Sequence, residues 1–213
     1  MKSISLLSKR ADLSAADFQA YYEDTHCWLG MQHFPFVRYT RNHVVADTDT
    51  RSVDFDCISE FAMAADFNGG DVMNSASRAL MVEDELKFMD PTHIRVASVR
   101  EQTLVGTLDA TLGLPRYVAL FQGVEQPALI EPAVKAWLAS VDTVRHASLD
   151  ECIARTGQSF PYQALLWLTL TDEQATTTLP QVGDLPGLLA VVPVTTHATP
   201  PATLSQNFKA YLP

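Results

Sequence analysis

The chain has 213 residues, of which 47% are hydrophobic and 19% charged, and its formal net charge is −10. This composition suits a packed core rather than disorder, and the acidic balance argues against nucleic acid or an anionic membrane as a partner. Cys27, Cys57 and Cys152 are widely spaced with no CxxC pair, and no apolar run is long enough to span a membrane. We therefore expect a cytoplasmic protein with neither a disulfide framework nor a structural zinc site.

An amphipathic helix is predicted over residues 15–28. Ser14 is a favourable N-cap, because its hydroxyl can accept a hydrogen bond from an amide of the first turn. Phe18 and Tyr22 recur at helical spacing, so they share one face of this helix. Glycine is common just after helices, which predicts that the helix ends near Gly30.

A strand is predicted over residues 36–46, after a break at Pro35. Tyr39, Arg41 and His43 alternate with other residues and therefore share one face of this strand. Two ring side chains and an arginine on one strand face are unlike an ordinary solvated surface. They are typical of the wall of a mixed polar and apolar cavity.

Three further strands and a second helix are predicted in the first half of the chain. The strands cover residues 2–10, 54–63 and 92–101. The helix lies within residues 64–88, and its expected packing positions are Met73, Ala76, Leu80 and Leu86. The resulting order, β-α-β-β-α-β, is the ferredoxin-like plan, in which an antiparallel sheet carries both helices on one face.

The second half repeats this order with weaker patterns. Its strands are predicted over residues 116–125, 143–154, 161–170 and 188–197. A helix over residues 128–140 follows the first of these strands, and Thr171 is expected to cap a short helix after the third.

We therefore predict an α+β protein built from two ferredoxin-like β-α-β-β-α-β repeats, whose antiparallel sheets pack face to face as one barrel-like unit. The predicted segments are a first repeat over 1–102, a linker over 103–115, a diverged second repeat over 116–198 and a C-terminal tail over 199–213. The alternative is that each half pairs with a second chain, which leaves a homodimer open.

The first half resembles the EthD family of the dimeric α/β-barrel superfamily over residues 1–101. The matching segments are LSAADFQAYYEDTH, RYTRNHV, DFDCISEF and FMDPTHIRV. The second half looks like a diverged copy without these motifs. The resemblance implies a ferredoxin-like fold with a cavity between helices and sheet. Relatives in the superfamily include cofactor-free monooxygenases, polyketide cyclases, lactone isomerases and haem-linked enzymes. The resemblance therefore predicts the fold more specifically than the reaction.

Two histidines are the candidate acid–base residues, because imidazole titrates near neutral pH. His26 follows Tyr22 by one helical turn, and Tyr22 is expected to orient it or to donate a hydrogen bond to a substrate oxygen. For His26 the alternative is a bond to the last carbonyls of its helix, and for His43 it is cross-strand packing. The catalytic candidates are thus His26, His43 and Tyr22, and the substrate-binding candidates are Tyr39, Arg41 and Phe18. We assign no chemical role to His33, His93, His146 and His197.

These residues predict a protein that binds a small, largely apolar or aromatic oxygenated molecule. The expected chemistry is cofactor-free acid–base chemistry of lyase, isomerase, cyclase or monooxygenase type. The alternative is a non-catalytic ligand-binding or assembly protein on the same fold, so enzymatic activity stays an open question. Glu23 and His26 form only half of a helix-bundle metal motif, and no nucleotide-binding motif occurs, so we expect neither a metal nor a cofactor.

Overall fold

The computed structural model describes residues 1–45, 53–155, 157, 159–209 and 212. Residue contacts divide the chain into two compact units. Unit 1 is formed by residues 1–43, 54–95 and 197–213, and unit 2 by residues 44–53 and 96–196. The units are therefore interleaved along the chain.

The sheet of unit 1 contains three antiparallel strands. They are β1 (Lys2–Leu7), β2 (Phe36–Val44) and β3 (Cys57–Met63), with β3 in the middle. β1 and β3 pair in continuous register from Lys2 with Ala62 to Leu7 with Cys57. Every residue of β1 is buried, so this strand is covered on both faces. The three predicted strands are confirmed.

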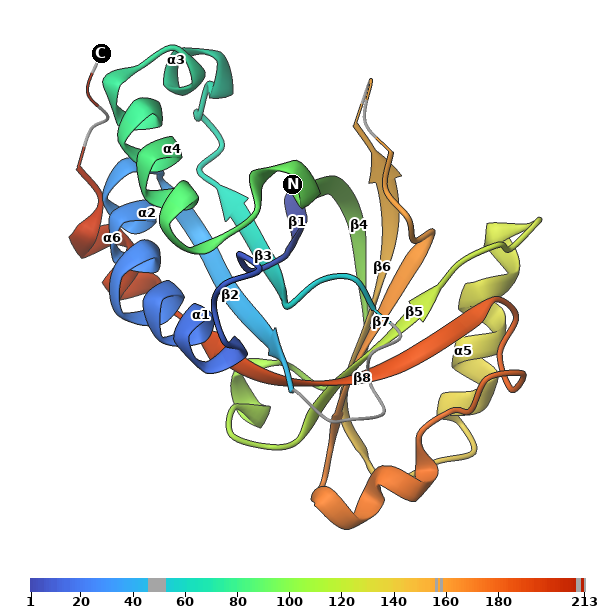
Figure 1. The fold of residues 1–213 in the computed structure, drawn as a ribbon. Coiled ribbons are helices and arrows are strands. Elements are labelled where there is room, and N and C mark those ends of the chain that lie inside the picture. Colours follow the sequence, from blue (N-terminus) through green and yellow to red (C-terminus); the bar gives the residue numbers. More distant parts are fainter. Residues whose placement is uncertain (46–52, 156, 158, 210–211, 213) are drawn as a thin grey trace. The chain divides into compact units, whose positions relative to one another are not determined.

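One helical rod packs on this sheet and carries the motif that the sequence singled out (Figure 1). It consists of α1 (Ala15–Tyr21), a π-helical turn (Tyr22–His26) and α2 (Cys27–His33). The predicted cap is confirmed, because the Ser14 hydroxyl accepts a hydrogen bond from the Asp17 amide at 3.0 Å. The predicted end near Gly30 is wrong. The helix continues to His33 and stops before Pro35, which disfavours a helical conformation in the residue preceding it.

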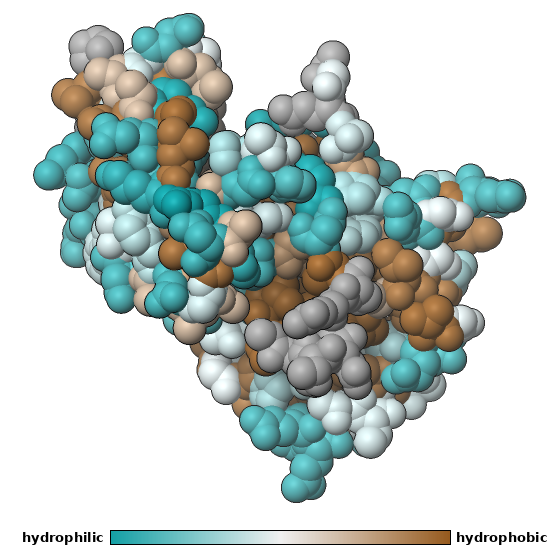
Figure 2. All heavy atoms as spheres, viewed as in Figure 1, coloured by the Kyte–Doolittle hydropathy of each residue, from teal (hydrophilic) through white to brown (hydrophobic). Residues whose placement is uncertain are grey.

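The second helical region of unit 1 comprises α3 (Gly69–Met73) and α4 (Ala76–Phe88). The predicted packing positions are wrong, because all four of those side chains are exposed: Met73, Ala76, Leu80 and Leu86. Apolar side chains accordingly lie among polar ones on the surface over α3 and α4 (Figure 2). The buried face instead carries Ser77, Met81, Asp84 and Phe88. Two of these residues are polar, and both bond to groups far away in the sequence.

Two short elements complete unit 1. A 3₁₀ turn, Pro91–His93, is capped by the Asp90 carboxylate, which accepts a hydrogen bond from the Thr92 amide. Near the C-terminus, α6 (Pro201–Asn207) lies beside α2 (Figure 1). The expected C-terminal tail therefore contains a helix.

Unit 2 holds a five-stranded antiparallel sheet in the order β4-β6-β7-β5-β8. Its strands are β4 (Arg95–Val105), β5 (Arg116–Phe121), β6 (Val144–Ala154), β7 (Ala164–Leu170) and β8 (Leu188–Ala198). One face packs against α5 (Ile130–Leu138) through alternate residues such as Leu166 and Leu168. β7 is buried along its whole length, which explains why all its residues but Thr169 are apolar.

Some boundaries in the second half differ from those predicted. β4 runs to Val105, three residues into the expected linker. A 3₁₀ turn (Pro127–Leu129) precedes α5. The predicted short helix is a 3₁₀ helix (Glu173–Thr178), and its cap is the side chain of Asp172 rather than Thr171. Among the helices of the described residues, none is both long and apolar enough to cross a membrane.

Candidate functional site

A buried carboxylate on α4 holds the histidine of the π turn. The Nδ1 atom of His26 lies 2.8 Å from Oδ2 of Asp84, and the hydroxyl of Tyr21 donates to Oδ1 of Asp84 at 2.7 Å. The hydrogen bond from His26 keeps the pKa of Asp84 below its usual value, against the opposing effect of burial. An ionised Asp84 accepts the Nδ1 proton, so in the neutral form of the imidazole the lone pair is on Nε2. Within the described residues, Nε2 makes no hydrogen bond to protein.

The turn that carries His26 is the one part of the rod that is not α-helical. Its π geometry brings the Cys27 amide to the Tyr22 carbonyl, five residues back. Such a turn inserts an extra residue and rotates the side chains that follow it around the helix axis, and it is frequent at functional sites. Here the turn contains Tyr22, Glu23 and His26, which all point into the protein.

A second carboxylate, Glu23, holds the second candidate histidine. Oε1 of Glu23 accepts a hydrogen bond from Nε2 of His43 at 2.7 Å. Oε2 of Glu23 accepts from Nη2 of Arg41 at 2.7 Å and from Nε at 3.0 Å. Burial alone would raise the pKa of Glu23, but the hydrogen bonds from His43 and Arg41 lower it to about 2. The carboxylate is therefore ionised at neutral pH and fixes both partners.

The free nitrogen of His43 is enclosed in protein. His43 is buried, and its Nδ1 atom has no hydrogen-bond partner within the part of the chain that the structure describes. Such buried polar atoms are uncommon and call for an explanation, such as a bound ligand. His26 and His43 thus share one arrangement: one nitrogen is bound to a carboxylate, and the other has no protein partner.

Tyr22 lies between these two imidazoles. Its ring centre is 5.1 Å from that of His26 and 5.5 Å from that of His43, both in edge-on geometry. The Tyr39 hydroxyl donates to the Tyr22 hydroxyl at 3.3 Å. Burial raises the pKa of both tyrosines well above the normal value. Both remain phenols at neutral pH, so each keeps a hydroxyl hydrogen and neither is a base.

Phe18 and Arg41 complete the set of six predicted site residues. Phe18 is buried, and its ring packs against Tyr22, His43 and Phe88. Arg41 is buried as well, and all three guanidinium nitrogens donate to protein groups. A substrate oxyanion at Arg41 would compete with these bonds. The structure thus brings all six residues into one cluster in unit 1.

Four further residues of the cluster were missed in the sequence analysis: Asp84, Glu23, His197 and Thr199. The spacing of Met81, Asp84 and Phe88 was an available signal, because it puts the carboxylate on one helical face with two large apolar residues. From the sequence, Glu23 was weighed only as half of a metal motif with His26, which does not predict its bonds to His43 and Arg41. The sequence contains no local signal for the two C-terminal residues.

The cysteine that follows His26 in the sequence is unsuited to nucleophilic chemistry. Cys27 donates its thiol hydrogen to the Glu23 carbonyl at 2.9 Å. Burial raises the pKa of the Cys27 thiol to about 11, so the thiolate is scarce at neutral pH. Among the described residues, no group of three or more histidine, cysteine or acidic side chains is arranged to hold a metal ion.

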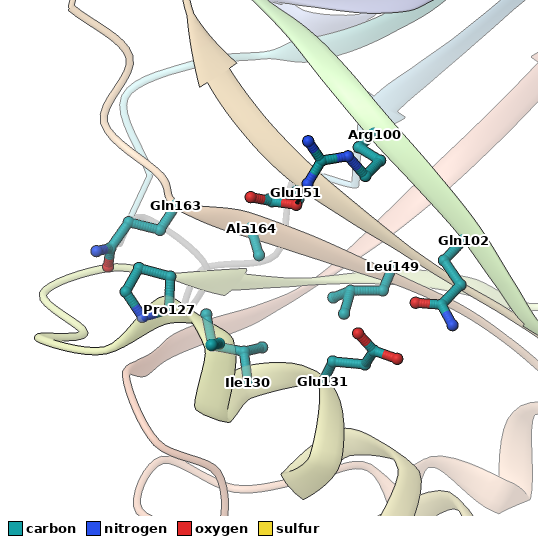
Figure 3. Close-up of a pocket in the computed structure, with 10 residues that line it drawn as sticks. Arg100, Gln102, Pro127, Ile130, Glu131, Leu149, Glu151, Gln163 and Ala164 are labelled. Atoms are coloured by element: carbon teal, nitrogen blue, oxygen red, sulfur yellow. Dashed lines mark hydrogen bonds and ion pairs between the residues drawn. The ribbon is translucent and has the colours of Figure 1, made fainter.

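Unit 2 has a hollow of about 350 Å³ beside the start of α5 (Figure 3). Its charged and polar lining groups bond to protein: Arg100 to Glu151, Glu131 to Lys135, and Gln163 to the backbone of Val124. Its lining contains no histidine. Both histidine–carboxylate pairs of the candidate site are in unit 1 and do not line this hollow.

Part of the chain matches a known family, and its fold matches solved structures. Residues 10–92 match the EthD domain, a range that includes both histidine–carboxylate pairs but less than half of the chain. A solved anthrone oxidase-like protein matches with a TM-score of 0.58 and 12% identity, over 92% of each chain. A putative monooxygenase from Lactobacillus acidophilus NCFM matches with a TM-score of 0.50 and 13% identity, again over 92% of each chain. At these identities the matches show a shared fold. A comparison with curated proteins finds no match.

Proposed function

We propose that the protein binds a small, largely apolar oxygenated molecule and carries out cofactor-free acid–base chemistry on it. An aromatic molecule is the favoured ligand. The observation that carries this proposal is the Asp84–His26 pair, in which one imidazole nitrogen is held by a buried carboxylate and the other has no protein partner among the described residues. Fixing the tautomer in this way prepares a histidine to accept a proton at a defined atom.

In this proposal, Nε2 of His26 removes a proton from a carbon next to a carbonyl group. A positioned general base of this kind contributes about 10²- to 10⁴-fold to a rate. Tyr22 donates a hydrogen bond to the oxygen on which negative charge develops, since its raised pKa keeps the phenol protonated. His43 holds a substrate hydroxyl through its buried Nδ1 atom. Phe18 and Tyr39 supply aromatic surface for the ring of the ligand.

Proton removal from such a carbon is the first step of several reactions. An enolate can eliminate a leaving group, shift a double bond, close a ring or react with molecular oxygen. Lyase, isomerase, cyclase and monooxygenase outcomes therefore share one requirement, a base beside an oxyanion donor. The names of the two structural matches, anthrone oxidase-like protein and putative monooxygenase, make anthrone a reasonable first probe.

One observation favours the alternative, a non-catalytic binding or assembly protein on the same fold. Tyr22 and His43 are each only 2% exposed, and Tyr22, Arg41 and Glu23 already bond to protein groups. A site that satisfies its own polar groups can persist after catalysis is lost. This alternative predicts that a ligand binds without turnover.

The test is turnover by the wild type, His26→Gln and His93→Gln. His93 is exposed and bonds to Asp90 outside the cluster, so it is a matched histidine control. Each protein is incubated with anthrone and with a panel of aromatic lactones and hydroxylated ketones, with and without oxygen, and substrate loss is measured by mass spectrometry. Turnover that is lost in His26→Gln and kept in His93→Gln supports the proposal. Unchanged turnover in His26→Gln contradicts it, and binding without turnover in the wild type supports the alternative.

We further propose that residues 1–102 and 116–198 are two repeats that complete one barrel-like unit within a single chain. The match over 92% of the anthrone oxidase-like protein supports this proposal. A homodimer is the alternative assembly. Native mass spectrometry of untagged protein distinguishes the two, since a monomer that retains ligand contradicts a site that requires a second chain.

A further inference from the structure

The C-terminal arm, defined as residues 197–209, reaches the second histidine pair. The backbone amide of Thr199 donates to the carbonyl of Tyr39 at 3.0 Å. The hydroxyl of Thr199 accepts from Nη1 of Arg41 at 2.6 Å, across 158 residues of sequence. Both bonds end on β2, the strand that carries His43.

His197 belongs to the same contact. Its Nδ1 atom lies 3.7 Å from Oε2 of Glu23, and its Nε2 atom accepts a hydrogen bond from the side chain of Gln19 at 3.3 Å. The ring centres of His197 and His43 are 5.6 Å apart. Burial lowers the pKa of His197, and the neighbouring Glu23 offsets part of this effect. The arm thus adds a third imidazole beside one carboxylate.

The rest of the arm is anchored firmly. Leu204 of α6 is 2% exposed and packs into the apolar cluster that includes Phe18 and Tyr22. The amide of Lys209 donates to the Gln32 carbonyl of α2 at 2.9 Å. Figure 1 shows α6 beside α2. A buried side chain and a backbone hydrogen bond at the far end hold the arm in one position.

The bonds form a chain of contacts from the arm to His43. Thr199 accepts from Arg41, Arg41 donates to Glu23, and Glu23 accepts from His43. Arg41 is buried, so loss of the Thr199 hydroxyl would leave Nη1 of Arg41 with only a long hydrogen bond of 3.5 Å to the Tyr39 carbonyl. The guanidinium would then shift to find another acceptor, and Glu23 would move with it.

We infer that the C-terminal arm is a working part of the candidate site, in which Thr199 is a positioning residue for Arg41 and, through Glu23, for His43. The arm lies outside residues 10–92, so the segment that matches the EthD domain does not hold this pair alone. The inference rests on the proposed function only for the chemical use of His43. The contacts themselves are tested without a substrate.

The experiment compares the full-length wild type with Thr199→Val, which removes the hydroxyl at similar size, and Thr199→Ser, which keeps it. Ser205→Ala on the exposed side of α6 is the control for a change in the arm itself. The measurement is the ¹⁵N NMR signals of the histidine rings as a function of pH. His26 serves as an internal reference, because its partner is Asp84.

Thr199→Val is expected to shift the His43 signals and to leave those of His26 in place, while Thr199→Ser restores the wild-type spectrum. In Thr199→Val, loss of the hydrogen bond between Arg41 and the Thr199 hydroxyl is also expected to speed hydrogen exchange of the Thr199 amide by about five- to tenfold. Unchanged His43 signals in Thr199→Val, or a failure of Thr199→Ser to restore them, would overturn the inference. If Thr199→Val does not fold, hydrogen exchange of the Thr199 amide in the wild type decides. An amide that exchanges without protection overturns the inference. An amide protected from exchange as strongly as the amides of β2 supports it. None of these readouts depends on turnover, so they stand even if the proposed function fails.

Discussion

His26 and Asp84 are 58 residues apart in the sequence, and their side chains meet in a buried hydrogen bond of 2.8 Å. The bond joins the π turn to the inward face of α4, next to the ring of Phe88. It decides which imidazole nitrogen carries the proton, and it therefore decides which nitrogen is available to a ligand. The proposed function depends on this relationship.

Replacing Asp84 by asparagine tests the relationship directly. An amide in place of the carboxylate no longer requires a proton on Nδ1 of His26, so the tautomer with the proton on Nε2 becomes favourable. We expect proton abstraction to fall by about 10²-fold or more. The measurement is the turnover rate, combined with the ¹⁵N NMR signals of the His26 ring.

Glu83→Gln is the matched control for this change. Glu83 precedes Asp84 on α4, but its side chain is 73% exposed, so a neutral replacement there should leave turnover and tautomer unchanged. An Asp84→Asn protein that keeps both the wild-type rate and the wild-type His26 signals would rule out the tautomer role.

Acid unfolding provides a test of the Glu23 pair. The pKa of Glu23 is lowered from 4.5 to about 2 in the folded protein. A lowered pKa means that the group stabilises the fold above pH 4.5 and that this contribution is lost as the pH falls toward 2. The contribution is roughly 3 kcal/mol of unfolding free energy. Glu23→Gln should therefore show a flatter loss of stability over this pH range than the wild type.

Denaturant unfolding at a series of pH values measures this difference. Glu151→Gln is the control, since the Glu151 side chain is 52% exposed and its pair with Arg100 is a surface contact of little value. The Glu23→Gln protein should also be less stable at neutral pH, because Arg41 is left buried without its charged partner. Parallel curves for the wild type and Glu23→Gln would refute the assignment.

Phe18→Ala tests the packing beneath the site. Phe18 is 1% exposed, and its ring contacts Tyr22, His43 and Phe88. Removing a buried phenyl ring leaves a cavity and should lower the unfolding free energy by about 3–5 kcal/mol. Leu86→Ala, at a position that is 52% exposed on α4, should cost less than about 1 kcal/mol. Equal losses in the two variants would contradict the packing described for α4.

A glycine of unit 2 allows a stability prediction away from the site. Gly106 has a φ of 56°, and an added Cβ atom would lie 2.1 Å from the Arg145 carbonyl oxygen. Gly113 also has a positive φ, of 89°, but an added Cβ there meets nothing within 4 Å. Gly113→Ala should cost about 1 kcal/mol from backbone strain alone. Gly106→Ala should cost at least about 2 kcal/mol more, because the backbone must move as well. Equal melting temperatures for the two variants would be the contrary result.

The strands and the capped helix start were predictable because their signals are local. Alternation or short apolar runs mark most of the described strands, and Ser14 bonds to an amide only three residues away. The face of α4 was not predictable in this way. Ser77 and Asp84 look like surface residues in the sequence, and their burial depends on His33 and His26, which are 44 and 58 residues distant.

In the candidate site too, the residues with local signals were predictable and those that depend on distant contacts were not. Tyr22, His26 and His43 stood out through their residue types and their positions on one helix and one strand. The π turn was missed, because nothing in helical periodicity announces an extra residue. The contribution of Thr199 depends on a contact across 158 residues, which no pattern in one sequence reveals.

Proton exchange tests the central claim, that His26 acts as a base oriented by Asp84, without knowledge of the natural substrate. An aromatic ketone such as α-tetralone is incubated in D₂O under nitrogen, and deuterium uptake beside the carbonyl is followed by mass spectrometry. The account predicts uptake above the buffer rate in the wild type and in His93→Gln, and a loss of about 10²-fold or more in His26→Gln. Equal uptake by His26→Gln and the wild type, or wild-type uptake no faster than buffer alone, would contradict it.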